Sequence, residues 1–336
     1  MRRRGGNGQV RIEDVARRAG VAPITVSRAL RTPDKVSKEA RARIEEAVRA
    51  VGYVPNLIAG SLASNRTNLV AALVPTIENP LFAITLRGLS DVLRRHGLHL
   101  MVGSSAHSRE EEERVVRMFL GQRPCGLFLH ETLHSDAARE MLCRAGIPIV
   151  ETGDLIDDPM DVVVSFSNSG AVRAAMVHLA ARGYRRIALV TTPHSARAEA
   201  RRRGYREGLR EAGLNEARER IVEVIATVGG GAEAIARLLE AEPEIDAVLF
   251  TGNAAAVGGL LECQKRGWAV PTRVALATFD DTDLARHVAP ALTVVRIPRY
   301  EIGERAAECL IARLEGRPPA ARQVDLGFEI VPRGSS

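Results

Sequence analysis

The amino-acid sequence predicts an α/β protein with an N-terminal helix-turn-helix head and a larger body of two lobes, each a doubly wound parallel sheet. Two patterns lead to this prediction. Residues 12–30 read as two short helices around Gly20, which supplies a tight turn. From Leu69 onward, short apolar runs alternate with helical patterns, and the whole alternation occurs twice along the chain. The 336 residues are enough for a small head and one or two larger domains.

The positive charge of the chain is concentrated in the head. Residues 1–66 contain 14 of the 47 Lys and Arg residues and 6 of the 41 Asp and Glu residues, so this segment carries a formal charge of +8. The remaining 33 basic and 35 acidic residues leave the body at −2. A basic segment beside a helix-turn-helix pattern is typical of a protein that neutralises the phosphates of double-stranded DNA. A merely solvated basic surface would not concentrate the charge in one fifth of the chain.

The composition argues against a membrane, secreted, metal-binding or catalytic protein. No apolar run approaches the roughly 18 residues that span a bilayer. The basic N-terminal residues are not followed by the apolar stretch of a signal peptide, so we expect a cytoplasmic protein. The four cysteines form no C-x-x-C pair and are expected to be reduced. No Ser-His-Asp order, Walker loop or metal-ligand spacing occurs, so we expect no enzymatic activity, no cofactor and no metal site.

The first helix, over residues 12–19, is predicted by apolar residues at helical spacing: Ile12, Val15, Ala16 and Ala19. Pro23 suits the first position of the second helix, because its missing N–H would have no partner there. The side chains of the second helix that are expected to face inward are Val26, Ala29 and Leu30.

Four side chains of the second helix are left to face DNA. Arg28 is the candidate for a bidentate contact to a guanine edge. Thr25 and Ser27 suit phosphate contacts. Ile24 has no polar side-chain atom and is expected to offer only apolar contact, for instance to a thymine methyl group.

The third helix is expected to begin after Ser37, a good N-cap, and to end at Gly52. The head therefore spans residues 10–54, behind a flexible N-terminus of residues 1–9. Pro55-Asn56 breaks the chain, and residues 57–64 are too few for a stable isolated helix. Two interpretations of residues 55–66 stay open: an ordinary linker, which the residue types alone favour, or a hinge helix that folds on DNA and inserts Leu62 as a wedge in the minor groove.

The body, residues 67–336, is expected to alternate strands and helices. The expected strands or extended segments are 69–75, 98–103, 126–129, 147–150, 162–166, 187–190, 247–250, 274–277, 292–296 and 323–331. The expected helices are 81–96, 110–120, 137–145, 171–182, 198–212, 232–239, 254–266 and 301–314. The loops at the carboxyl ends of the strands should line a cleft between the lobes that closes on a small molecule. Gly229-Gly-Gly231 is expected to be a turn leading into a helix rather than a phosphate loop.

Taken together, these residues resemble the LacI/GalR repressors over essentially the whole chain after residue 10. The head motifs that carry the resemblance are Asp14-Val-Ala, Ala19-Gly-Val, Thr25-Val-Ser-Arg and Gly52-Tyr-x-Pro-Asn56. Four further motifs resemble one branch, the repressors of gluconate-utilisation operons: Glu78-Asn-Pro-Leu-Phe82, the segment from Asp161 to Asn168, Gly183-Tyr-x-x-Ile187-Ala, and the closing segment from Asp325 to Ser335. The chain departs from the family at Arg11 and Ala22, where a helix-capping hydroxyl residue is usual, and at Ala254, where Asn-Asp is common.

The resemblance implies a repressor that binds a near-palindromic operator as a homodimer and has a two-lobed, periplasmic-binding-protein-like body. Arg28 would read guanine, Asn56 would cap the hinge helix, and Leu62 would be the inserted leucine. An effector would bind in the cleft, and a buried arginine there would suit the carboxylate of a sugar acid, gluconate above all. The implied effector contacts are Leu81, Phe82, Arg201, Asn253 and Asp280. The sequence leaves open which of the three consecutive arginines enters the cleft; with Arg201 as the family match, Arg202 and Arg203 are expected to be solvated.

The sequence also predicts where the two lobes of the body begin and end. The first lobe is expected over about 67–164 and 294–324, and the second over about 165–293 and 325–336.

A solute-binding protein of transport shares the two-lobe architecture. That class requires a secretion signal and gives no reason for the basic head, so a transcriptional regulator is the favoured interpretation.

Overall fold

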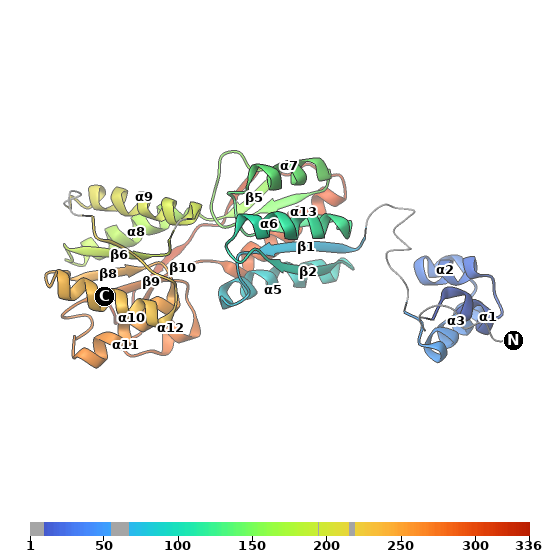
Figure 1. The fold of residues 1–336 in the computed structure, drawn as a ribbon, viewed down its shortest axis with the longest axis horizontal. Coiled ribbons are helices and arrows are strands. Elements are labelled where there is room, and N and C mark those ends of the chain that lie inside the picture. Colours follow the sequence, from blue (N-terminus) through green and yellow to red (C-terminus); the bar gives the residue numbers. More distant parts are fainter. Residues whose placement is uncertain (1–9, 55–66, 194, 215–218) are drawn as a thin grey trace. The chain divides into compact units, whose positions relative to one another are not determined.

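The computed structural model describes residues 10–54, 67–193, 195–214 and 219–336. It separates into two compact units, residues 1–67 and 68–336, which are described here one at a time (Figure 1). The expected flexible N-terminus and the expected hinge, with Asn56 and Leu62, lie outside the described residues. None of the described helices is long and apolar enough to cross a membrane.

The head is a bundle of three α-helices with a short 3-10 turn. The elements are α1 (Ile12–Ala19), α2 (Pro23–Arg31), η1 (Pro33–Lys35) and α3 (Lys38–Val51). The buried side chains at its centre are Val15, Ala16, Ala19, Val26, Ala29, Ile44 and Ala47. The prediction that Leu30 faces inward is wrong, because its side chain is 37% exposed. The last turn of α2 turns Leu30 away from the α1–α3 packing that buries Val26.

The ends of these helices show which caps are present. Ser37 caps α3 as expected, with its hydroxyl oxygen accepting from the Ala40 N–H at 3.3 Å. Gly20 ends α1 with φ +66°, a left-handed conformation that glycine adopts at little cost. The Arg11 side chain has no hydrogen-bond acceptor and cannot cap α1. Only one of the two hydrogen bonds of a capping box therefore forms, the one in which the Asp14 carboxylate accepts from the Arg11 N–H at 3.0 Å. Ala22 gives α2 no side-chain cap.

The first lobe of the body is a six-stranded parallel sheet in the order β11-β5-β4-β3-β1-β2. Its strands are β1 (Leu69–Val74), β2 (His99–Ser104), β3 (Gly126–Leu129), β4 (Ile149–Glu151), β5 (Val162–Ser165) and β11 (Gln323–Asp325). Its helices are α5 (Pro80–Arg95), α6 (Arg109–Gly121), α7 (Asp136–Ala145) and α13 (Arg299–Leu314). The apolar runs of β1 and β3 are buried on both faces, as a sheet covered by helices on both sides requires.

The second lobe repeats this plan in the order β12-β10-β9-β8-β6-β7, with only β12 antiparallel to its neighbour. Its strands are β6 (Ile187–Thr191), β7 (Ile221–Glu223), β8 (Ala247–Phe250), β9 (Ala275–Phe279), β10 (Thr293–Arg296) and β12 (Glu329–Val331). Its helices are α8 (Asn168–Ala181), α9 (Ala196–Glu211), α10 (Val228–Ala241), α11 (Asn253–Arg266) and α12 (Asp283–His287). The sequence patterns did not predict β7 and α12.

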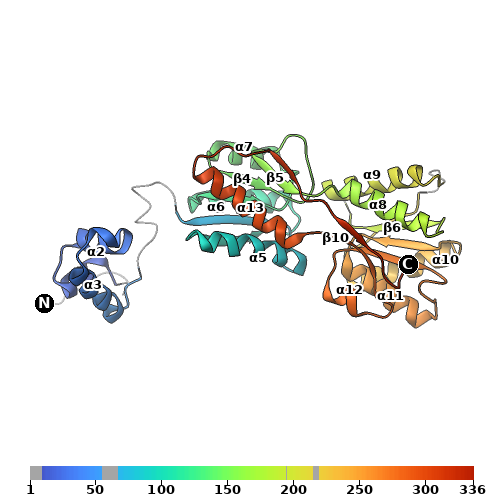
Figure 2. The same cartoon turned by 180° about the vertical axis from the view of Figure 1, so that it is seen from behind.

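The chain passes between the lobes after β5, between β10 and α13, and between β11 and β12 (Figure 2). The expected crossing at residue 294 falls inside β10, which belongs to the second sheet, so the chain crosses only after Arg296. Asp325 still pairs in the first sheet, so the last crossing follows it. The final segment, expected as one extended stretch, is therefore two short strands in two different sheets.

Glycines allow pairs of helices to pack at unusually short distances. Gly88 on α5 faces α13, and a Cβ atom there would overlap the backbone oxygen of Tyr300. Gly303 on α13 makes the reciprocal approach to Thr85 of α5. The run 229–231, expected as a turn, lies in the first turn of α10, where Gly231 packs in the same way on α11. The missing side chains thus serve helix packing, because backbone meets backbone at these positions.

A buried ionic cluster fixes the loop that follows β3. His134 is 1% exposed and contacts Glu112 of α6 through Nδ1, while its Nε2 lies 3.5 Å from Glu151 at the end of β4. Glu151 also accepts from the Met160 N–H at 2.6 Å. Burial alone would lower the pKa of His134, but hydrogen bonds to the two carboxylates and their negative charge raise it to about 9. His134 is therefore a structural cation at neutral pH.

We expect Gly88→Ala to lower the free energy of unfolding by about 1–3 kcal/mol, because the added methyl group forces α5 away from α13. Urea unfolding followed by circular dichroism measures this change. Gly121→Ala, at the end of α6 where a Cβ atom meets nothing within 4 Å, is the matched control and should leave the stability unchanged or slightly raised. Equal effects of the two substitutions would show that close packing is not what requires Gly88.

The His134 cluster predicts a pH dependence of stability. The folded-state pKa lies above the unfolded value of about 6.5, so the stabilisation is fully present below pH 6.5 and is lost as the pH rises through about 9. We expect the wild-type protein to exceed His134→Gln in unfolding free energy by on the order of 3 kcal/mol at pH 6, with the difference narrowing by pH 10. A difference that stays constant across this range would contradict the charged state of His134.

Candidate nucleic-acid interface and ligand site

The exposed face of α2 carries all four residues predicted to face DNA. Ile24 is 60% exposed and Arg28 is exposed, while Thr25 and Ser27 are half-buried. Val26 and Ala29 of the same helix are buried, so the two sets lie on different sides of α2. Within the described part of the head, no hydrogen bond or ion pair engages the Arg28 guanidinium. The side chain is therefore able to extend toward a base edge without breaking an existing contact.

Arg201 lies on α9 and is buried, with 8% of its surface exposed. Its Nε donates to the Asn168 side-chain oxygen at 2.9 Å and its Nη1 to the Thr251 carbonyl at 3.4 Å. The guanidinium also stacks over the Phe279 ring, 4.9 Å from the centroid. All these contacts are with uncharged groups. Burial lowers the pKa of Arg201 to about 9, and the positive charges of Arg197 and Arg299 act in the same direction.

Asn253 and Asp280 meet on the second-lobe side of the same region. Asn253, the first residue of α11, donates to the Asp280 carbonyl at 3.1 Å and accepts from the Thr282 hydroxyl at 2.9 Å. Asp280 directly follows β9 with φ +68°, a conformation uncommon outside glycine. Its carboxylate accepts from Arg299 Nε at 2.7 Å and Nη2 at 3.0 Å. Both carboxylate oxygens therefore already have a charged partner.

Phe82 and Leu81, at the start of α5, occupy different places. The Phe82 ring packs edge-on against His130 with a centroid distance of 4.5 Å, and the Arg197 guanidinium lies over it at 5.9 Å. Leu81 lines a separate cavity of about 470 Å³ beside the crossing segments, which it shares with Tyr300 and Phe328. The structure thus brings Phe82 toward Arg197 of the second lobe and places Leu81 beside the segments that cross between the lobes.

Sequence reasoning missed Asn168, which connects much of this region. Its backbone N–H and side-chain nitrogen donate to Asp154 at 3.0 and 3.2 Å, and the side-chain nitrogen also donates to the Gly153 carbonyl at 2.7 Å. Its remaining side-chain oxygen accepts from Arg201. A signal was present, because Asn168 closes one of the family motifs and follows a predicted strand at its carboxyl end.

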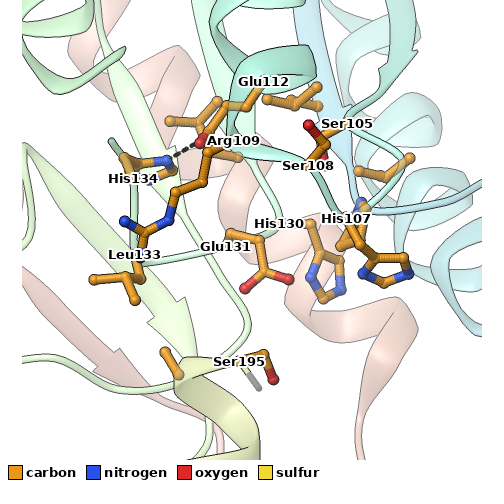
Figure 3. Close-up of a pocket in the computed structure, with 15 residues that line it drawn as sticks. Ser105, His107, Ser108, Arg109, Glu112, His130, Glu131, Leu133, His134 and Ser195 are labelled. Atoms are coloured by element: carbon orange, nitrogen blue, oxygen red, sulfur yellow. Dashed lines mark hydrogen bonds and ion pairs between the residues drawn. The ribbon is translucent and has the colours of Figure 1, made fainter. Parts of the chain in front are cut away.

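A cavity of about 130 Å³ opens where the two lobes face each other (Figure 3). His130 and Glu131, which follow β3, line it from the first lobe, and Ser195 lines it from the start of α9. Glu131 accepts from Arg197 of α9 at 2.9 Å, so an ion pair joins the lobes beside the cavity. Neither Arg201 nor Asn253 lines this cavity; both lie in the adjoining polar network.

The three consecutive arginines have three different environments. Arg201 points into the network described above, and Arg203 is exposed, 3.8 Å from Glu207, as expected for a surface residue. The expectation that Arg202 is solvated is wrong. Its side chain is 9% exposed and pairs with Glu199 and with Glu223 of β7, a strand that the sequence did not predict.

This arrangement is suited to binding rather than to covalent chemistry. The polar groups gather at the carboxyl ends of strands from both lobes, where doubly wound sheets bind ligands. Among the described residues they supply amide, guanidinium and carboxylate groups, each held by its neighbours through hydrogen bonds. A molecule seated here would contact both lobes.

Two family models match the chain. Residues 11–56 match the model described as "Bacterial regulatory proteins, lacI family", and residues 176–336 match the model described as "Periplasmic binding protein-like domain". The first match covers the head, and the second covers the second lobe from the middle of α8 onward, together with the last segments of the first lobe. Both agree with the resemblance noted in the sequence.

Similar proteins cover nearly the whole chain. The HTH-type transcriptional regulator GntR of Pseudomonas aeruginosa is 38% identical over 330 residues, covering 98% of this chain and 96% of the relative. The HTH-type transcriptional regulator GntR of Escherichia coli K12 is 34% identical, covering 96% and 98%. A crystal structure of a LacI-family transcriptional regulator from Silicibacter pomeroyi is 35% identical with a TM-score of 0.88, covering 97% and 99%.

These relatives are transcriptional regulators and not enzymes, which confirms the class that the sequence predicted. The chain is a member of the LacI family of DNA-binding bacterial transcriptional regulators.

Proposed function

We propose that this protein is a homodimeric repressor whose affinity for a near-palindromic operator is set by a small sugar acid, such as gluconate, bound between the lobes. The observation that carries the proposal is the environment of Arg201. A buried guanidinium is costly unless a negative charge compensates it, and Arg201 donates only to neutral oxygens within the described chain. A ligand carboxylate would supply the missing charge through a bidentate contact.

The neighbouring arginines do not need a ligand carboxylate to compensate their charge. Arg197 pairs with Glu131 and Arg299 pairs with Asp280, so each already has a carboxylate. The side-chain amide of Asn253 donates one hydrogen bond and accepts one, so its second N–H remains to suit a hydroxyl group of a polyhydroxy acid. The motif resemblance to the gluconate branch, together with the two relatives named GntR, supports gluconate as the first compound to test.

Ligand binding can change operator affinity only if the ligand prefers one arrangement of the two lobes. A molecule held by Arg201 of the second lobe and by residues after β1 and β3 of the first lobe would have that preference. Residues 55–66 join the first lobe to the head, so we propose that they transmit the change. We also propose a cytoplasmic location, because a regulator of bacterial transcription must reach the DNA that it binds.

Exposed apolar side chains on the body support a homodimer. Val102 lies on β2, an edge strand of the first sheet, and is 43% exposed, while Met118 of α6 is 52% exposed. On the second lobe, Leu261 and Leu284 are about half exposed, at 49% and 52%. Apolar side chains of this size, and the unpaired edge of a sheet, are favourable places for contact with a second copy.

For DNA, we expect Arg28→Ala to weaken binding to an operator selected from a random-sequence pool by about 1–3 kcal/mol, because a bidentate base contact is lost. Binding to scrambled DNA should change far less. Fluorescence anisotropy with both duplexes at one salt concentration measures the two affinities. Equal losses on both duplexes would assign Arg28 to phosphate contact instead of base recognition.

For the effector, we expect Arg201→Ala to abolish gluconate binding, measured by titration calorimetry, while operator binding persists. Arg203→Ala, an exposed neighbour on the same helix, is the matched control and should bind gluconate like the wild-type protein. Wild-type protein that binds neither gluconate nor any other sugar acid would refute the proposed effector class. Binding of gluconate by Arg201→Ala would place the carboxylate elsewhere.

A further inference from the structure

Arg197, in the first turn of α9, is a second-lobe side chain that reaches into the first lobe. Its Nη2 atom donates to the carboxylate of Glu131, which follows β3, at 2.9 Å. Its guanidinium carbon lies 5.9 Å from the centroid of the Phe82 ring, near the start of α5. Its Cδ atom lies beside Gly153, which follows β4. Arg197 therefore meets three separate elements of the other lobe.

The ion pair of Arg197 and Glu131 is largely shielded from water. The two side chains are 15% and 25% exposed, whereas both members of a surface pair such as Arg173 and Glu211 are about half exposed. Figure 3 shows the Glu131 carboxylate directed toward the segment that carries Ser195, two residues before Arg197. Because water screens exposed pairs, the shielded pair is expected to hold its two residues together more strongly than a surface pair does.

Positive charges from both lobes gather near this ion pair. Arg201 of the second lobe feels the charges of Arg197 and of Arg299, which belongs to the first lobe. Arg299 is compensated by Asp280, and Arg197 is compensated by Glu131. Loss of the Glu131 charge would leave Arg197 without this carboxylate at a boundary that already holds two other arginines. Repulsion between the cations would then favour separation of the lobes.

Neither partner of the pair belongs to a segment that crosses between the lobes. Glu131 follows β3 of the first sheet, and Arg197 lies on α9, after β6 of the second sheet. The ion pair of Arg299 and Asp280, in contrast, lies beside the crossing after β10, where the chain itself connects the lobes. In a hinged opening, contacts away from the crossings must separate, while the crossings stay connected.

We propose that Arg197 and Glu131 form a latch that holds the two lobes of a subunit closed, as in the structure, through contacts of the protein alone. Opening of the cleft breaks the pair. The latch sets the fraction of closed molecules and therefore the cost of closure that a ligand has to meet. This last consequence rests on the proposed function, because it assumes a ligand held by both lobes. The latch itself does not.

The test measures the distance between the lobes in the full-length protein without gluconate. Cys143 of α7 is exposed and carries one spin label, and Arg203→Cys on α9 carries the other. Cys309→Ala removes the one remaining cysteine that is partly exposed, since Cys125 and Cys263 are buried. Double electron–electron resonance is recorded with labelled subunits diluted into an excess of unlabelled protein, so that each measured distance lies within one chain.

We expect the labelled protein to show the closed distance alone. Glu131→Gln should lower the ratio of closed to open molecules about fivefold and add a population with a different, open distance. Arg197→Gln removes the other partner and should have the same effect. Glu211→Gln, which takes the carboxylate from an ion pair within the second lobe, is the matched control and should keep the closed distance. Closed distances in both Glu131→Gln and Arg197→Gln would overturn the latch.

Titration calorimetry with gluconate separates the latch from the proposed function. Glu131→Gln should bind gluconate more weakly in proportion to the closed fraction that it has lost. Weaker binding without any change in the distances would make Glu131 a ligand contact and overturn the latch. Wild-type protein that binds no sugar acid would refute the proposed function, and the distance measurement would still decide whether the latch exists.

Discussion

The ion pair between Arg299 and Asp280 is the interaction on which the arrangement of the cleft depends. Arg299 begins α13 of the first lobe, and Asp280 follows β9 of the second, so the pair joins the lobes beside the crossing after β10. It engages the side chain of Asp280, whose backbone has a left-handed conformation that an aspartate tolerates at some cost. By occupying both oxygens of Asp280, it also leaves Arg201 without a carboxylate, although Asp280 is near enough to influence its pKa.

Buried polar groups in this protein fall into two kinds. The cluster of His134, Glu112 and Glu151 balances a cation against carboxylates, and it lies within one lobe, where it connects β4, α6 and the loop after β3. Arg201 lies at the boundary of the two lobes and donates only to the neutral oxygens of Asn168 and Thr251. The first kind balances a buried cation with carboxylates inside one lobe, whereas the second leaves a buried cation without a carboxylate hydrogen-bond partner among the described residues.

Local patterns predicted most elements of the fold, and long-range contacts account for what they missed. The apolar runs of β3 and β8 are bounded by turn residues, so their ends agree with the structure, whereas β7 is short and half-exposed and left no such pattern. The division of residues 323–331 between two sheets depends on which strand each half pairs with, which no local pattern encodes. In the candidate ligand site, the family resemblance indicated Arg201, but the pairing of Arg299 with Asp280 arises only when the two lobes meet.

The interleaving of the lobes has a consequence for synthesis on the ribosome. The head is one continuous segment and can fold as soon as it emerges, since its core needs nothing beyond Tyr53. The first lobe is complete only when α13 and β11 have been made, and the second lobe only when β12 has been made, and these are the last elements of the chain. A chain interrupted before residue 323 would therefore carry a folded DNA-binding head on an unfinished body. Complete translation is thus a condition for closing both sheets of the body, whereas the head requires only its own short segment.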